Sequence, residues 1–291
     1  MSFIKEYKIE YLNRLNSVNS FKESWNVWGN HISTLLNDPS GQDILNIGDK
    51  LSEIYKLNDS VGRGQGSLSA AGASWECLVM WYLNLIYWNT NTIITTTNKQ
   101  YVPKCIRDVL TVTISNTQTN TESDIVVFSV PEDNLLDKTK VSVKYLNDHI
   151  LTRLGKTNLM NLQCKTNWNE NSQIPMLWDM IYNSRSSLHY VSVGTEGVNP
   201  NSLESFCYGF VTVPTNNKDK IKRTSISVLR VKNLTGGNYW GHPSSEDIAS
   251  SIKELPNRFV PEVFEGGISA HISNNIAKNS NYLSSFTNLS W

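Results

Sequence analysis

Residues 124–130, Asp-Ile-Val-Val-Phe-Ser-Val, and residues 158–165, Asn-Leu-Met-Asn-Leu-Gln-Cys-Lys, decide the expected fold. Apolar residues, several of them β-branched, fill both runs, which is typical of strands inside a sheet. Asp124 begins the first run, and Gln163 and Lys165 close the second. These polar side chains can project from strand ends while the rest of each strand is buried.

The remaining pattern predicts helices and strands on both sides of these runs. Further strands are expected at residues 109–115, 140–145, 188–194, 206–213 and 226–232. Helices are expected within 3–55, from the end of a glycine-rich loop at 61–72, and at 145–154, 172–182 and 245–255. This order predicts an α/β fold with α+β character: a central mixed β-sheet flanked by helices.

The composition indicates one compact domain. Of the 291 residues 39% are hydrophobic and 18% charged, so the chain can bury a sizeable core. We expect a single domain, 1–291, with an N-terminal helical part (1–60), a core (61–235) and a C-terminal extension (236–291). The formal charge is zero, 26 basic against 26 acidic side chains, which excludes a polybasic binder and requires any nucleic-acid surface to be local.

The cysteines and the apolar segments indicate a cytoplasmic chain. The four cysteines form no CxxC pair and do not flank a histidine at metal-ligand spacing, so we expect free thiols and no zinc site. The N-terminus lacks the pattern of an export signal. The most apolar segment, 77–88, is shorter than the roughly 20 residues needed to span a bilayer, so no membrane partner is expected.

The two decisive runs can supply the groups for phosphodiester hydrolysis with Mg²⁺. This chemistry needs oxygen ligands for the metal and a cation that positions the attacking water. Asp124 offers a carboxylate on one strand. Gln163 and Lys165, two positions apart, share one face of the next strand. We therefore predict a catalytic site with Asp124, Gln163 and Lys165.

Asp124 followed by Gln163-Cys-Lys165 resembles the PD-(D/E)XK nuclease superfamily. The segment 69–79, Ser-Ala-Ala-Gly-Ala-Ser-Trp-Glu-Cys-Leu-Val, is similar to the helix before the catalytic strands of type II restriction endonucleases. In that family the glutamate of this helix approaches the metal, a role that falls here on Glu76. The resemblance covers roughly residues 67–195 and implies a restriction-endonuclease-like core with Asp124, Gln163 and Glu76 as metal ligands.

The chain departs from the family pattern at Ser123, where the motif name has proline, and at Gln163, where an acid is more common. A neutral amide oxygen is a weaker ligand for Mg²⁺ than a carboxylate. Glu76 is therefore the first candidate for a compensating acid, Asp179 the second, and Glu170 a poorer third.

Rival placements of the aspartate and the lysine remain open. Asp133 follows a proline and a glutamate, but it lies in an expected turn. Lys144 offers another lysine on an expected strand.

Two loops are candidates for DNA contacts. Backbone amides and a helix N-terminus in a glycine-rich loop can receive a phosphate. Amide side chains directly after the catalytic lysine can contact base edges. The candidate residues are Arg63, Gln65, Ser67 and Ser69 in the first loop, and Asn167 and Asn169 in the second.

The resemblance implies a sequence-specific double-strand DNA endonuclease that uses one or two Mg²⁺ ions per active site and leaves 5′-phosphates. A palindromic target favours a homodimer, and a restriction system implies a cognate DNA methyltransferase. One alternative is a structure-specific nuclease of the same superfamily. Another, motivated by Gln163, is a catalytically inactive DNA-binding protein, and the weakest is a tryptophan-rich ligand-binding protein.

Overall fold

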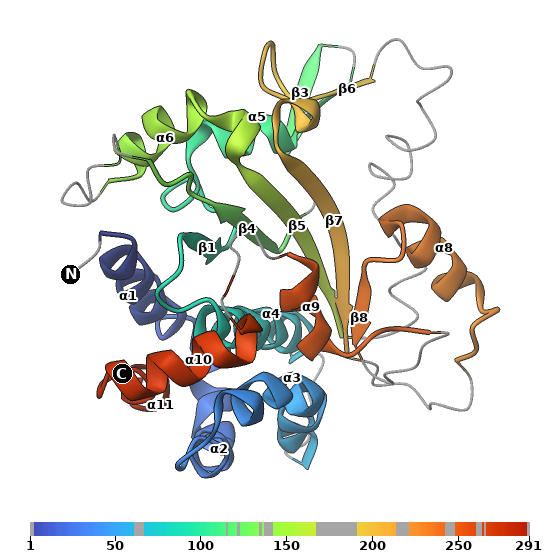
Figure 1. The fold of residues 1–291 in the computed structure, drawn as a ribbon. Helices are drawn as coiled ribbons and strands as arrows, with labels where there is room; N and C mark the ends of the chain where they lie inside the picture. Colours follow the sequence, from blue (N-terminus) through green and yellow to red (C-terminus); the bar gives the residue numbers. More distant parts are fainter. Residues whose placement is uncertain are drawn as a thin grey trace.

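The computed structural model describes residues 3–60, 67–114, 116–120, 123–133, 136, 142–166, 191–213, 221–241, 248–259, 264 and 266–289 (Figure 1). The α-helices are α1 (Phe3–Leu15), α2 (Asn19–Leu35), α3 (Gly41–Lys56), α4 (Ser67–Ile86), α5 (Lys104–Leu110), α6 (Val143–Leu151), α8 (Ile226–Thr235), α9 (Leu255–Arg258), α10 (Gly267–Lys278) and α11 (Ser284–Thr287). Short 3₁₀ turns are η1 (Leu57–Ser60), η2 (Leu154–Lys156), η5 (Pro200–Ser202) and η7 (Ile252–Glu254). The strands are β1 (Thr92–Thr95), β2 (Thr111–Ile114), β3 (Thr117–Asn120), β4 (Ile125–Ser129), β5 (Asn158–Lys165), β6 (Val191–Val193), β7 (Ser205–Thr212) and β8 (Tyr239–Gly241).

The main sheet has five strands in the order β1-β4-β5-β7-β8. β1, β4 and β5 are antiparallel neighbours, whereas β5, β7 and β8 run parallel. Ile125 lies opposite Leu162, and Cys164 lies opposite Val211. Helices lie on both sides of this sheet (Figure 1), which confirms the expected α/β class with a central mixed sheet.

A second, three-stranded antiparallel sheet has the order β3-β2-β6 and lies at the top of Figure 1. β2 and β3 form a hairpin, in which Thr113 pairs with Gln118. On the other side of β2, Thr113 pairs with Ser192 of β6. This small sheet is joined to the main sheet at two points, since β3 leads into β4 and β6 leads into β7.

α4 is the central helix of the core. Trp75 and Trp81 on it are fully buried, and so are most residues around its circumference, because other elements cover it on several sides. One hydrophobic cluster runs from Ile4 to Leu289, so the N-terminal and C-terminal helices share one core. A smaller cluster lies between β7, β8 and α8, whose outer side exposes Ile226 and Leu229.

The end of α4 is capped by a buried lysine from α1. Lys8 is 1% exposed, and its ammonium group donates to the backbone oxygens of Tyr87 (2.6 Å) and Thr90 (2.9 Å). The last carbonyl groups of a helix have no partner within the helix and carry partial negative charge. The cation therefore satisfies them where water cannot reach.

α3 packs closely against the C-terminal part of the chain. A Cβ atom on Gly48 would lie 2.5 Å from the backbone nitrogen of Lys253. Glycine at this position permits the close approach of α3 and η7, because any side chain would push the two segments apart.

The strands expected at 124–130, 158–165 and 206–213 are confirmed as β4, β5 and β7. The strand expected at 226–232 is wrong, because these residues form α8. Val228 and Val231 are buried on one side of that helix, and Gly236 ends it with a left-handed backbone conformation.

The strand expected at 140–145 is also wrong where the structure describes it, since α6 begins at Val143. The Ser142 hydroxyl accepts the backbone N–H of Tyr145 and caps this helix. At 109–115 only β2 is a strand, because Val109 and Leu110 still belong to α5. The helix expected at 172–182 lies outside the described residues.

Candidate functional site

Asp124 lies directly before β4, beside the end of β5. Its backbone nitrogen donates to the oxygen of Leu162 (3.1 Å), as the antiparallel ladder requires. Its carboxylate oxygen Oδ2 accepts the backbone N–H of Cys164 at 2.7 Å. A side chain thus takes the place of a backbone partner, and this hydrogen bond fixes the carboxylate next to the residue that precedes Lys165.

α4 crosses the same end of the sheet. The indole Nε1 of Trp75 donates to the backbone oxygen of Val211 at 3.5 Å, and Val211 is the partner of Cys164 in the β5–β7 pair. Glu76 follows Trp75 along the helix. Burial of Trp75 against β7 therefore brings Glu76 close to Asp124 and Lys165.

The electrostatics of Glu76 report this proximity. The pKa of the Glu76 carboxyl is raised from 4.5 to about 7 as the net result of three effects: burial and the Asp124 carboxylate raise it, and the Lys165 cation lowers it. The Cys164 thiol responds to the same charges. Its pKa is raised well above its ordinary value, first by burial and then by Asp124 and Glu76, which disfavours the thiolate form.

Gln163 has a different environment from the one expected of a metal ligand. It is 1% exposed, and its side-chain oxygen Oε1 accepts a hydrogen bond from the Tyr208 hydroxyl at 2.6 Å. Tyr208 belongs to the hydrophobic cluster beneath α8. The amide oxygen therefore already has a protein partner. Sequence reasoning missed Tyr208, because nothing in the sequence indicates which strand becomes the neighbour of β5.

Several predicted residues are not described. Arg63, Gln65, Asn167, Asn169, Glu170 and Asp179 lie outside the described residues. The backbone of Ser67 and Ser69 forms the first turn of α4, but their side chains are not described. The structure thus brings together Glu76, Asp124 and Lys165, and the loop contacts stay predictions.

Neither rival residue lies at this site. Asp133 forms an ion pair with Nε of Arg153. Lys144 was expected on a strand, but it lies exposed on α6, which begins one residue earlier at Val143. The pair Asp133 and Lys144 therefore does not form the expected strand arrangement.

Within the described ranges, no three or more His, Cys, Asp or Glu side chains form a group that could hold a metal ion. The four cysteines Cys77, Cys105, Cys164 and Cys207 are free, as expected. In the same part of the chain, no helix is long and apolar enough to cross a membrane.

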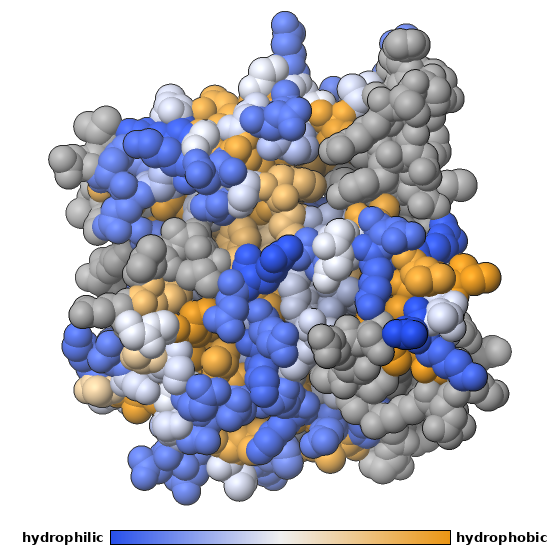
Figure 2. All heavy atoms as spheres, turned by 45° about the vertical axis from the view of Figure 1, so that its right-hand side comes forward, coloured by the Kyte–Doolittle hydropathy of each residue, from blue (hydrophilic) through white to orange (hydrophobic). Residues whose placement is uncertain are grey.

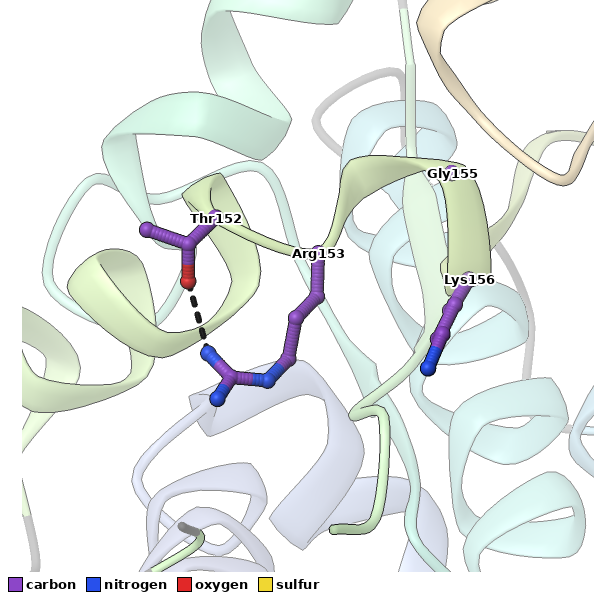
Figure 3. Close-up of a pocket in the computed structure, with 4 residues that line it drawn as sticks. All are labelled: Thr152, Arg153, Gly155 and Lys156. Atoms are coloured by element: carbon purple, nitrogen blue, oxygen red, sulfur yellow. Dashed lines mark hydrogen bonds between the residues drawn. The ribbon is translucent and has the colours of Figure 1, made fainter.

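A surface hollow of about 650 Å³ lies at the other end of β5, lined by Thr152, Arg153, Gly155 and Lys156 (Figure 3). The Arg153 guanidinium turns toward the neighbouring Thr152 and donates to its hydroxyl at 2.6 Å (Figure 3). With a rise of about 3.3 Å per residue, the first residue of the eight-residue strand β5 is about 23 Å from Lys165. This hollow is therefore separate from the cluster of Glu76, Asp124 and Lys165.

Comparison of the chain with protein-family models, with curated proteins and with solved structures found no match.

Proposed function

We propose that this chain is a sequence-specific, Mg²⁺-dependent DNA endonuclease with a restriction-endonuclease-like core. The observation that carries the proposal is the convergence of Glu76, Asp124 and Lys165 from one helix and two adjacent strands. The resemblance seen in the sequence implies a glutamate helix beside an aspartate strand and a lysine strand. The antiparallel pairing of β4 with β5 and the contact of α4 with β5 support this relation.

The residues present fit a hard divalent cation. Glu76 is partly buried and makes no hydrogen bond to the described part of the chain that would stabilise its charge. The neighbouring Asp124 carboxylate repels that charge. Mg²⁺ binds through one or two carboxylates and completes its coordination with water and phosphate oxygens. Glu76 and Asp124 would hold it here, whereas the bond from Tyr208 favours a structural role for Gln163.

Each residue of the cluster has a separate task in the proposed reaction. Bound Mg²⁺ would supply positive charge against the phosphate and the leaving 3′ oxygen. The backbone N–H of Cys164 holds the Asp124 carboxylate in place, so this carboxylate would need little reorganisation when it binds Mg²⁺. Lys165 donates from Nζ to the attacking water and orients it toward phosphorus. The water oxygen bonds to phosphorus as the P–O3′ bond breaks, and the water proton passes to solvent, so the products carry a 3′ hydroxyl and a 5′-phosphate.

The proposed partners follow from the expected target. Two copies of the chain, related by a two-fold axis, would bring one cluster to each strand of a palindromic duplex. A cognate DNA methyltransferase would protect the same sequence in the host. Asp179, which lies outside the described residues, stays a candidate for a further acid.

The test is incubation of the purified chain with plasmid and phage DNA in Mg²⁺, with Ca²⁺ as a control. We expect discrete fragments from the native chain and none from Lys165→Ala. Lys156→Ala is the matched control, because Lys156 is exposed at the opposite end of β5. Intact DNA across substrates and methylation states would refute nuclease activity, and continued cutting by Lys165→Ala would refute the role of this lysine.

A second function is favoured by the Gln163 geometry: a DNA-binding protein that keeps this fold without catalysis. The engaged amide oxygen leaves only two carboxylates among the described residues of the cluster. This alternative predicts duplex binding in Ca²⁺ and Mg²⁺ without nicking. It also predicts that Gln163→Glu, which adds an acid, creates Mg²⁺-dependent nicking in the otherwise inactive chain.

A further inference from the structure

The small sheet carries a row of uncharged polar side chains across its three strands. Thr113 of β2 lies between Gln118 of β3 and Ser192 of β6 in the pairing register. Directly paired residues of antiparallel strands lie on the same face of the sheet. Gln118, Thr113 and Ser192 therefore form one polar row, and the neighbouring row, with Val112 and Val193, lies on the opposite face.

This polar row is accessible and borders a hollow. Gln118 and Ser192 are exposed, Thr113 is half-buried, and none of the three side chains makes a hydrogen bond to the described part of the chain. The hollow has a volume of about 440 Å³ and continues over the turn that carries Glu196. Figure 2 shows hydrophilic atoms projecting at the top of the molecule, where this sheet lies.

The chemistry of the row suits base edges better than phosphates. None of the described residues that line the hollow is a lysine or an arginine, and Glu196 would repel a phosphate. Gln pairs with adenine through two hydrogen bonds, Ser and Thr bond to several bases, and Glu accepts from the amino group of cytosine. The donors and acceptors of Gln118, Thr113, Ser192 and Glu196 therefore complement a groove edge.

The distance to the proposed active site also suits DNA. Gln118 on β3 lies six residues before Asp124, so the two Cα atoms are at most about 22 Å apart. Since DNA rises 3.4 Å per base pair along the axis, this limit corresponds to about six base pairs. A hairpin at this distance can reach bases on one side of a bond held at Asp124.

We infer that the β2–β3 hairpin, with β6 beside it, enters a groove of duplex DNA and reads base edges through Gln118, Thr113 and Ser192. A two-stranded β-ribbon fits the major groove, which is about 12 Å wide. The inference rests on the proposed function in that it takes duplex DNA as the partner, but it concerns recognition and not cleavage.

The test is selection of binding sites from duplexes with a randomised central segment, in Ca²⁺ so that cleavage does not interfere. The native full-length chain is compared with Gln118→Ala, with the double variant Thr113→Val and Ser192→Ala, and with Gln42→Ala. Gln42 is the matched control, because it is an exposed glutamine on α3. Thermal unfolding verifies that all variants are folded.

We expect a defined base preference in the native chain, and about tenfold weaker binding of that sequence by Gln118→Ala, with relaxed preference at one or two positions. Binding to unrelated duplexes and the behaviour of Gln42→Ala should stay unchanged. An unaltered preference in both hairpin variants, or no preference in the native chain, would overturn the inference. Cleavage is measured in a separate assay. If the hairpin variants cut the site selected by the native chain at the native rate, the inference about the hairpin is refuted and the proposed nuclease activity is not. If the native chain selects a sequence but does not cut it, only the proposed nuclease activity is refuted.

Discussion

Glu76→Gln should stabilise the chain at alkaline pH. The pKa of Glu76 is about 7 in the folded chain against an ordinary 4.5, so the folded state binds this proton more tightly than the unfolded state. The stability from this group is fully present below pH 4.5 and is lost as the pH rises through 7. A difference of about 2.5 pH units corresponds to at most about 3 kcal/mol at pH 8 and above, less a reduction for solvent screening.

Glutamine does not ionise, so the variant should lack this loss. Urea unfolding followed by tryptophan fluorescence, at pH 5 and pH 8, measures the free energy of unfolding of both proteins. We expect the advantage of Glu76→Gln over the native chain to grow by one to three kcal/mol, as an order of magnitude, between these pH values. Mg²⁺ should shrink the advantage at pH 8, because a cation stabilises the ionised carboxylate.

The control is Glu23→Gln, an exposed glutamate on α2. If the free energy of unfolding depended on pH in the same way in the native chain and in Glu76→Gln, the reasoning that burial and Asp124 act on Glu76 would be refuted. A pH-dependent difference that Mg²⁺ leaves unchanged would keep the electrostatic argument and contradict the metal site.

Three further substitutions test other parts of the structure. Asp124→Asn keeps an oxygen that accepts the Cys164 amide but removes the charge, so Mg²⁺-dependent cleavage should fall at least about a hundredfold while the melting temperature is maintained; retained cleavage would contradict the assignment. Lys8→Met should lower the free energy of unfolding by about 1 to 3 kcal/mol, because it removes the buried ammonium group that donates to the backbone oxygens of Tyr87 and Thr90, and a urea midpoint equal to that of the native chain would disprove the cap. Gly48→Ala should cost about 1 to 3 kcal/mol through its clash with η7, whereas Gly155→Ala, where a Cβ meets no atom within 4 Å, should be nearly neutral in the same denaturation series.

The long apolar strands could be predicted from the sequence, but the short amphipathic helices could not. All residues of the eight-residue strand β5 except the first and the last are buried, and this pattern does not depend on which strands pair with β5. In α8, by contrast, Ile226, Val228 and Val231 are β-branched residues typical of a strand, whereas the spacing of three between Val228 and Val231 places both on one side of a helix. The signal that decides between them is Gly236, a helix-terminating glycine directly after Thr235. α10 was missed because asparagine and serine dilute its short apolar stripe.

The cluster itself was predictable as far as it depends on strand ends and on one helix. Asp124 and Lys165 flank apolar runs, and Glu76 lies on a strongly apolar helix, so each residue type is unusual in its local context. The partner of Gln163 could not be predicted, because it comes from β7, more than forty residues later in the chain. Contacts between distant segments depend on strand order, which the local pattern does not encode.

The hydrogen bond from the Cys164 amide to Asp124 makes this amide a natural spectroscopic reporter. Its proton points at one carboxylate oxygen, so its chemical shift depends on the charge and the position of that oxygen. An ion or a phosphate that binds at the carboxylate would change the resonance of a single backbone nucleus, which lies one residue from Lys165. Occupancy of the cluster could thus be followed by observation of one amide in solution, without substitution of any residue.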